Sequence, residues 1–401
     1  MKTRQRKNRG GTKTKRLPTN PRKKSVIKIT PSHSKDEFTL MTFNIESWLN
    51  MISPASTDEE TEALKNAFTQ FLENPVSTAY PKWQALKDLF CDVDILCIQE
   101  DALLGTSEET NGYQKNFIKK IGNLNLVASC MSHPYTWPNI VGLYYPGSKL
   151  SNTIYSKYDA IPNLSVPAQL TTDLQTIVHP RCWAVSQLKI HVQSATRGDT
   201  IFNIIKKPVS VKVATIHLSG GRFDDITSLS GNNYIIKIRQ IIELIYREKP
   251  DIICGDFNTK IVPPEVDNYF SELPVEHSDE TPRIPVLADF YVSIYDHIIQ
   301  GIPLPNISIL DKWQIWMYGL DYIFKDPRLA ERITTVPYVS VFDNGSAKDT
   351  TIFGGTVDNI YYNPRRLNCV SNTVVDGVIL PGQRILSDHA PVKATFSLIN
   401  I

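Results

Sequence analysis

The chain has 401 residues, a length that suits one large domain or two ordinary ones. Hydrophobic residues make up 41% and charged residues 21%, close to globular averages, which excludes a wholly disordered or fibrous chain. The formal net charge of +2 hides an asymmetry, because residues 1–28 contain twelve Lys or Arg residues and no acidic residue. The rest of the chain holds 31 basic and 41 acidic residues, a net charge of −10.

We expect residues 1–37 to form a disordered basic tail. Its first 28 residues contain Gly10-Gly11, Pro18 and Pro21, and almost nothing apolar precedes Val26, so the segment cannot bury enough surface to offset its ordering entropy. No apolar run follows the basic start, which argues against a secretory signal. Basic tails bind phosphate backbones by releasing counterions, so nucleic acid is the favoured partner. The alternatives are an anionic membrane, a nuclear-import segment or a purely solubilising role. The composition is similar to that of tails on proteins of large DNA viruses.

Beyond the tail, short apolar runs rich in β-formers alternate with amphipathic helical patterns. Helices are expected over residues 57–72, 81–90 and 231–248, where apolar residues recur at helical spacing. Strands are expected over 38–44, 93–98, 125–130, 140–145, 182–190, 211–217, 251–254, 320–324, 357–362 and 391–398. No linker-like stretch interrupts this pattern, so we predict one α/β domain over residues 38–401.

The cysteines and the hydropathy pattern bear on the compartment. The chain has no run of about 18 apolar residues, so no membrane-spanning helix is expected. The cysteines form no Cys-x-x-Cys pair, and several lie inside apolar runs. We expect small buried hydrophobes rather than a disulfide framework or zinc site, and therefore an intracellular protein of the cytoplasm or nucleus, including a viral protein in its host cell. The six are Cys91, Cys97, Cys130, Cys182, Cys254 and Cys369.

Polar residues stand at the ends of the apolar strands. Each alone is more often a turn or cap residue, but five such placements in one chain indicate a shared rim where a rigid scaffold presents chemistry. These placements are Asn44, Glu100, His217, the pair Asp256 and Asn258, and the pair Asp388 and His389.

Four short motifs around these residues resemble, in order, the signatures of the endonuclease/exonuclease/phosphatase superfamily. They are Thr42-Phe43-Asn44, Ile98-Gln99-Glu100, Gly255-Asp256-Phe257-Asn258 and Ser387-Asp388-His389. Residues 215–218 resemble its central histidine motif, and residues 357–362 resemble its late aspartate strand. The resemblance covers residues 38–398 and implies a deoxyribonuclease-I-like fold. That fold is a four-layer α/β/β/α sandwich of two packed mixed β-sheets, with the active site along one edge.

The resemblance also implies a divalent metal site. Glu100 would be the primary ligand, and Asn44 and Asp388 would help to hold the ion directly or through water. Hard oxygen ligands suit Mg²⁺ or Mn²⁺, which neutralise charge on a phosphoryl group.

Catalytic roles follow from the same resemblance. His389 would contact the scissile phosphate or act as acid or base, polarised by Asp358. Asp256 would position or deprotonate the attacking water, while Asn258 and His217 would donate to phosphoryl oxygens.

Two assignments have rivals. Asp321 matches the wording of the late aspartate strand better than Asp358 does, but its distance from Asp388 matches worse, so we prefer Asp358. Arg222, which follows Gly220-Gly221, is a candidate substrate-binding guanidinium, against the alternative of an ordinary loop.

The motif set is most similar to that of tyrosyl-DNA phosphodiesterase 2-like members of the superfamily. We therefore predict a metal-dependent hydrolase of phosphodiester bonds in nucleic acid. The alternatives are an enzyme acting on phospholipid head groups or other phosphate esters, and a catalytically silent binding protein. The sequence leaves open DNA against RNA, endo- against exonuclease action, the physiological metal and the oligomeric state.

Overall fold

The computed structural model describes most of the sequence after the basic tail. The described residues are 37–45, 81–101, 118–131, 151–161, 168–169, 182–196, 203–218, 230–258, 284–303, 321–343, 349–351, 355–375 and 386–399. The predicted tail up to residue 36, the predicted helix at 57–72, the predicted strand at 140–145 and Arg222 lie outside them.

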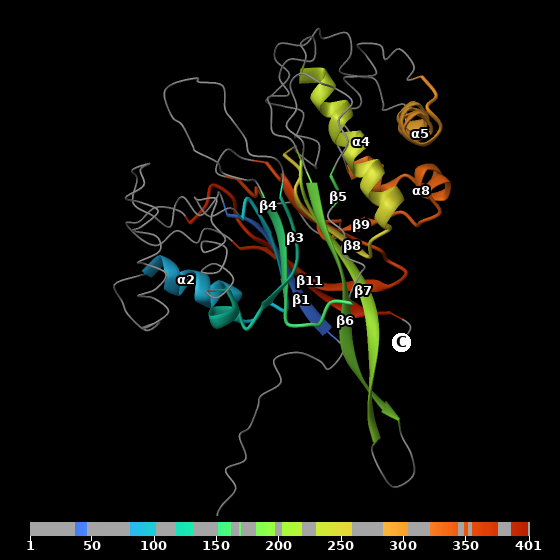
Figure 1. The fold of residues 1–401 in the computed structure, drawn as a ribbon. Coiled ribbons are helices and arrows are strands. Elements are labelled where there is room, and N and C mark those ends of the chain that lie inside the picture. The colour runs from blue at the N-terminus through green and yellow to red at the C-terminus, as the bar shows by residue number, and fades with distance from the viewer. Residues whose placement is uncertain are drawn as a thin grey trace, which may run out of the picture.

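Two mixed β-sheets of six strands each form the centre of the described chain (Figure 1). Sheet A has the order β11-β12-β1-β2-β4-β3, and sheet B has the order β5-β6-β7-β8-β10-β9. The strands of sheet A are β11 Leu367–Val374, β12 Val392–Leu398, β1 Glu37–Asn44, β2 Ile95–Gln99, β4 Ser151–Ser156 and β3 Asn125–Met131. Those of sheet B are β5 Ala168–Gln169, β6 Cys182–Thr196, β7 Asn203–His217, β8 Ile252–Asp256, β10 Asp358–Tyr362 and β9 Val339–Ser340. Each sheet has one parallel pair, β1 with β2 and β7 with β8, among otherwise antiparallel pairs.

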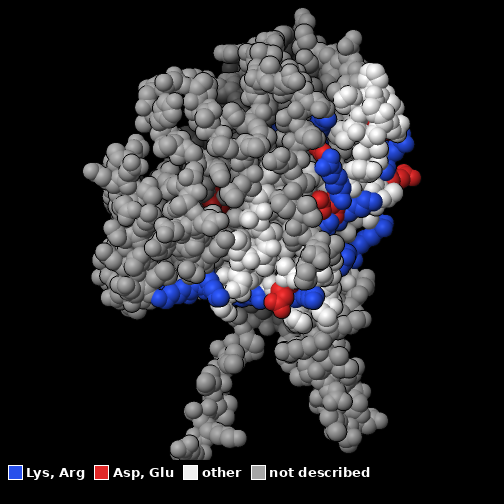
Figure 2. Space-filling view, viewed as in Figure 1, with Lys and Arg blue, Asp and Glu red and all other residues white. Residues whose placement is uncertain are grey.

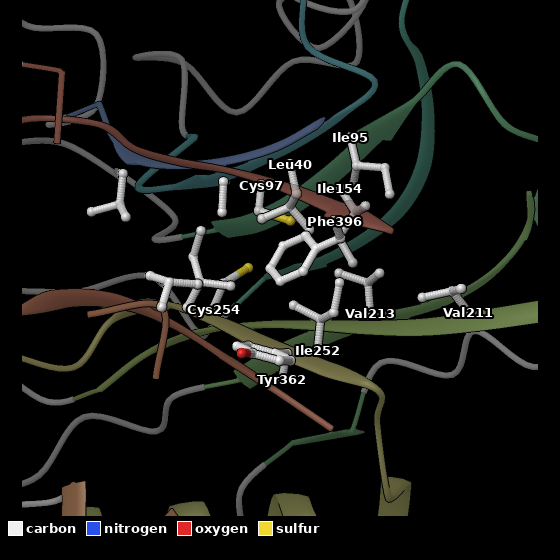
Figure 3. Close-up of a cluster of buried hydrophobic side chains, with 14 of the residues drawn as sticks. Leu40, Ile95, Cys97, Ile154, Val211, Val213, Ile252, Cys254, Tyr362 and Phe396 are labelled. Carbon is white, nitrogen blue, oxygen red and sulfur yellow. The ribbon is translucent and has the colours of Figure 1, made fainter. Parts of the chain in front are cut away.

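The sheets pack face to face through the residues that alternate along their strands. Leu40, Ile95 and Cys97 of sheet A and Val213, Ile252 and Cys254 of sheet B belong to one buried cluster between the sheets (Figure 3). Successive side chains of a strand point to opposite faces, so the intervening residues face outward. Burial of this shared apolar face holds the two sheets together.

Helices cover the outer face of each sheet. On sheet A, Leu86 and Phe90 of α2 Pro81–Phe90 pack against Met41 and Phe43. On sheet B, four helices bury the second large cluster, which includes Ile216 and Ile253: α4 Ser230–Glu248, α5 Ile284–Gln300, α7 Asp321–Lys325 and α8 Pro327–Ile333. The predicted four-layer α/β/β/α sandwich of two packed mixed sheets is therefore confirmed.

Some local predictions were wrong. Residues 320–324 were expected to form a strand, but Asp321–Lys325 is helix α7, whose Phe324 stacks on Tyr361 at a centroid distance of 3.8 Å. A five-residue apolar run fits either state, and packing on sheet B decides it. β4, β5, β9, β11, α5 and α8 were not expected at all. β6 and β7 form a longer hairpin than predicted, and it extends beyond the body of the sandwich (Figure 1).

The expectation that no cysteine forms a disulfide was also wrong. Cys130 of β3 and Cys182 of β6 are joined by a disulfide that links sheet A to sheet B, with their Cα atoms 6.1 Å apart. The two cysteines are 52 positions apart in the sequence and give no local signal, because the pairing arises only when the sheets pack. Cys97 and Cys254 are buried free thiols as expected, whereas Cys91 is exposed. We inferred a reducing compartment because all six cysteines were expected to be unpaired, and the Cys130–Cys182 disulfide removes that argument.

Basic and acidic side chains are interspersed on the described surface. On the face in Figure 2, Lys and Arg side chains lie along the lower margin and the right-hand side, with acidic side chains between them. Three lysines in or directly after strands pair with carboxylates at 2.6–3.3 Å: Lys157 with Asp94, Lys212 with Glu248 and Lys393 with Asp92. Partly solvated surface pairs of this kind contribute only about 0–1 kcal/mol each. Among the described helices, none is both long and apolar enough to cross a membrane.

Candidate active site

The inward-facing rows of both sheets change from apolar to polar at the same end. In β1, Leu40 faces the inter-sheet core, and the next inward positions are Thr42 and Asn44. In β8, Cys254 is followed inward by Asp256. The strand pairings align these ends, since Asn44 pairs with Gln99, and Asp256 pairs with both His217 and Asp358. The period of two therefore directs the polar residues of both sheets into one place between them.

On sheet A, Asn44 and Glu100 lie together and reach toward sheet B. Asn44 Nδ2 donates to Glu100 Oε1 at 3.2 Å and to Asp256 Oδ2 at 2.9 Å, which ties the two sheets at the site. His217 Nε2 lies 3.7 Å from Glu100 Oε1 and 3.5 Å from Asp256 Oδ2. Glu100 adopts a left-handed backbone conformation with φ of 54°, which is uncommon for a residue with a side chain.

The segment after β8 holds Asp256 in a fixed position. Gly255 has φ of +144°, and a Cβ added there would lie 1.9 Å from the carbonyl oxygen of Ile216 in the parallel strand β7. Only glycine allows this close approach. Asn258, also left-handed with φ of 49°, donates its backbone N–H to Asp256 Oδ1 at 2.7 Å. Its side-chain Nδ2 donates to Leu218 O at 2.9 Å and lies 3.3 Å from Asp256 Oδ2.

The loop before β12 brings a histidine against two buried carboxylates. His389 Nδ1 forms a hydrogen bond of 2.8 Å with Asp358 Oδ2, and its Nε2 lies 3.8 Å from Asp256 Oδ2. The same Nε2 lies 3.8 Å from Asp388 Oδ1. Ser387 fixes the loop, since its hydroxyl donates to Asn44 O at 2.7 Å and accepts from the backbone N–H of His389 at 3.1 Å. The imidazole is thus oriented from both sides.

The surroundings of His389 and Asp256 shift the pKa of both groups. Burial alone would lower the pKa of His389, but Asp358 and Asp256 outweigh it and raise that pKa to about 11, so the ring is an imidazolium at neutral pH. Burial raises the pKa of Asp256, assisted by the charge of Asp358, whereas His389 and the hydrogen bonds from Asn44 and Asn258 oppose the rise. A carboxylate made more basic beside a charged imidazolium is an arrangement suited to proton transfer.

The donor set fits a hard divalent cation. Asp256, Asp358 and His389 offer ligand atoms within 4.8 Å of one another, but His389 Nδ1 is already hydrogen-bonded to Asp358. Glu100 and Asp388 retain more solvent access, with 23% and 27% of their side chains exposed. Oxygen ligands with open coordination positions for water are what Mg²⁺ and Mn²⁺ prefer. Glu100 and Asp388 therefore have the open positions that such an ion needs, whereas the third predicted ligand, Asn44, is 2% exposed and donates from Nδ2 to Glu100 and Asp256.

Eight of the nine residues singled out in the sequence are joined in this cluster by the contacts above; the ninth, Arg222, lies outside the described residues. Asp358, preferred over Asp321, is the carboxylate on His389, and Asp321 begins helix α7. Two supporting residues carried no motif signal. Lys237 of α4 is fully buried and donates from Nζ to Asn258 O at 2.5 Å, and Asp101 follows Glu100 directly. Only a buried charge on the apolar face of a predicted helix could have indicated Lys237.

No protein-family model matches the chain, and no curated protein matches it in sequence. Solved structures with a similar chain course include proteins described as endonuclease/exonuclease/phosphatase family members, Nocturnin, TDP2 and ANGEL2. An endonuclease/exonuclease/phosphatase from Beutenbergia cavernae matches with a TM-score of 0.47 and 13% identity, over 90% of this chain and 72% of that one. The human Nocturnin catalytic domain matches with a TM-score of 0.43 and 15% identity, over 90% and 94% of the two chains. A humanized D. rerio TDP2 matches with a TM-score of 0.43 and 10% identity, over 91% and 100%.

Proposed function

We propose that this chain is a divalent-metal-dependent phosphoesterase that hydrolyses phosphodiester bonds in nucleic acid. The observation that carries the proposal is the single hydrogen-bonded cluster between the sheets, in which a solvent-accessible Glu100 lies beside Asp256 and a charged His389. Phosphoester hydrolysis needs neutralisation of the phosphoryl oxygens, an activated water and a stabilised leaving oxygen, and each need has a matching group here.

Glu100, with Asn44 and Asp388, would hold Mg²⁺ or Mn²⁺. The bound ion would supply the Lewis acidity that neutralises the phosphoryl oxygens. Asn44 would keep Glu100 at a fixed distance from Asp256 through its two hydrogen bonds of 3.2 and 2.9 Å.

The protein's own proton donors and acceptors would act on the opposite side of the phosphate. Asp256, whose raised pKa makes it a stronger base, would accept a proton from the attacking water. His389 would donate from Nε2 to a phosphoryl or leaving oxygen, while Asp358 stabilises its positive charge through Nδ1. His217 would donate to a second oxygen. Asn258 is bonded to Leu218 and Asp256, so we assign it to positioning Asp256 rather than to direct contact with phosphate.

The basic segment at residues 1–28 favours nucleic acid as the substrate class. The rest of the chain carries a net charge of −10, which disfavours tight binding of a polyanion without a local attachment point. A tethered cationic segment would raise the effective concentration of nucleic acid near the site.

The test is a hydrolysis panel with Mg²⁺, comparing the parent chain, Glu100→Gln and the matched control Glu248→Gln. The panel contains single-stranded and duplex DNA, RNA, abasic DNA, 5′-tyrosyl DNA, sphingomyelin and phosphoinositides. We expect metal-dependent cleavage of a nucleic-acid substrate, lost by about 10²-fold or more in Glu100→Gln. The control should keep it, because Glu248 bonds Lys212 outside the cluster. Hydrolysis of the lipids alone would reject the nucleic-acid assignment, and full activity of Glu100→Gln would reject the metal assignment.

A further inference from the structure

The residue predicted to hold the metal has a strained backbone. Glu100 has φ of 54°, in the small left-handed region where a Cβ crowds the backbone. Such a conformation persists only where the surroundings determine it on both sides. The question is therefore what fixes the chain immediately before and after Glu100.

Before Glu100, Gln99 is held by both sheets. This side chain is fully buried, and its Nε2 donates to Thr42 Oγ1 of β1 at 3.0 Å and to Thr215 Oγ1 of β7 at 2.7 Å. Gln99 also pairs with Asn44 in the parallel ladder. The upstream side of Glu100 is thus fixed in the space between the sheets.

After Glu100, Asp101 is held by β4. Its carboxylate is 4% exposed, and Oδ2 accepts from Thr153 Oγ1 at 2.5 Å and from Tyr155 OH at 2.7 Å. Both donors are buried, and they lie on the strand that pairs with β2, opposite Ile98 and Leu96. Tyr155 belongs to the cluster on the outer face of sheet A, so Asp101 is anchored on the side away from the inter-sheet core.

The charge of Asp101 has a cost beside Glu100, because two adjacent carboxylates repel each other and one of them is buried. Two hydroxyl donors on one oxygen offset that cost at Asp101 and direct its charge toward β4. Asp101 therefore lies next to the predicted metal ligand Glu100 and is itself anchored to a buried strand, which is how residues that orient a metal ligand are usually held.

We propose that Asp101, Thr153 and Tyr155 are positioning residues that hold Glu100 in its left-handed conformation and thereby set the affinity of the site for divalent metal. This inference rests on the proposed function, since it takes Glu100 as a metal ligand. It assigns a role in the site to strand β4, which contributes none of the eight clustered residues.

The test measures Mn²⁺ binding directly, by electron paramagnetic resonance and calorimetry, in Tyr155→Phe, Thr153→Val, Asp101→Asn and the Tyr155→Phe/Thr153→Val double variant. Tyr338→Phe is the matched control, because this buried tyrosine also loses one hydroxyl bond, of 2.7 Å to Pro250 O, outside the cluster. Loss of an outer-shell partner weakens metal binding by about 10- to 100-fold. We expect that loss in the Tyr155 and Thr153 variants, with kcat restored at saturating Mn²⁺, and no change in Tyr338→Phe.

Mn²⁺ affinity within twofold of the parent in both Tyr155→Phe and the double variant, with thermal melts showing them folded, would overturn the inference. An equal loss in Tyr338→Phe would also overturn it, because general destabilisation would then explain the effect. Glu100→Gln distinguishes failure of the proposed function from failure of the positioning role. If this variant keeps full Mn²⁺ affinity, Glu100 is not a metal ligand and the proposed function fails. If it loses affinity while the β4 variants do not, only the positioning role fails.

Discussion

Replacing Asp358 by Asn should convert His389 from a permanent cation into a group that titrates near neutral pH. The carboxylate lies 2.8 Å from His389 Nδ1 and is the largest of the influences that raise this pKa to about 11. At an effective dielectric constant of about 20, unit charges 3–4 Å apart interact by about 4–6 kcal/mol. Since one pKa unit corresponds to about 1.4 kcal/mol, removing that charge should lower the pKa of His389 by about three to four, to about 7–8.

The measurement is an NMR titration of the His389 imidazole in metal-free buffer, together with kcat in Mg²⁺. In the parent, the ring should stay protonated from pH 6 to 9, whereas in Asp358→Asn it should lose its proton across that range. We expect kcat to fall by about 10²- to 10⁴-fold, the usual size of a general acid–base contribution. Asp251→Asn is the matched control, because Asp251 is also buried but bonds Lys212 and Arg366 outside the cluster.

The same pair links stability to pH. A raised pKa in the folded state stabilises the protein fully below the unfolded value of about 6.5, and this stabilisation is lost as the pH rises through about 11. The free energy of unfolding in urea should therefore be higher for the parent than for Asp358→Asn at about pH 6.5, and this difference should shrink as the pH rises toward 11. An unchanged titration midpoint of His389, or a kcat within threefold of the parent, would refute the assignment of Asp358 as its partner.

Three further predictions concern the supports of the site and the tail. Gly255→Ala should lower the free energy of unfolding in urea by more than about 4 kcal/mol, because the added Cβ would lie 1.9 Å from Ile216 O. The control Gly301→Ala, whose Cβ meets nothing within 4 Å, should lower it by about 1–2 kcal/mol, and similar losses in both variants would contradict this prediction. Lys237→Met should lower the free energy of unfolding by about 1–3 kcal/mol and also lower kcat, because Asn258 O loses this donor. The control Lys249→Met, which loses an exposed hydrogen bond to Thr334, should change neither quantity, and an unaltered kcat in Lys237→Met would argue against a role for Lys237 in the site. Deleting residues 1–28 removes twelve positive charges and should weaken binding to long DNA and flatten its salt dependence in fluorescence anisotropy, so an unchanged slope would remove the role of the tail.

The strand ends of the site could be predicted from the sequence because their signal is local. Asn44, Glu100 and Asp256 each stand directly after or at the end of a short apolar run, and the period of two fixes which way Asn44 and Asp256 point. Glu100 is in phase with the outward-facing Leu96 and Ile98, so the alternation alone does not place it at the site; it follows the end of β2 in a left-handed conformation. The choice of Asp358 over Asp321 depended on spacing along the chain. The structure explains why the rival fails, since residues 321–325 form helix α7 instead of a strand.

What could not be predicted depends on contacts between segments far apart in the sequence. The Cys130–Cys182 disulfide joins strands of different sheets, and the β4 donors to Asp101 come from 52 and 54 residues along the chain. Lys237 could have been noticed only as a charge on the apolar face of its helix, and its acceptor, the carbonyl oxygen of Asn258, lies 21 residues further along the chain. Strand β4 is buried but contains Asn152 and Thr153, whose hydrogen-bond partners lie far along the chain, and β11 is largely exposed, so neither shows a clear alternation of apolar and polar residues.

The two halves of the site belong to different sheets, with Asn44 and Glu100 on one and His217, Asp256 and Asp358 on the other. Turnover therefore depends on how closely one sheet docks against the other, and not only on whether each is formed. A partly unfolded chain in which the sheets have slid or separated would keep most of its secondary structure and yet be inactive. Loss of hydrolysis during gentle denaturation is thus expected to precede loss of the far-ultraviolet circular dichroism signal.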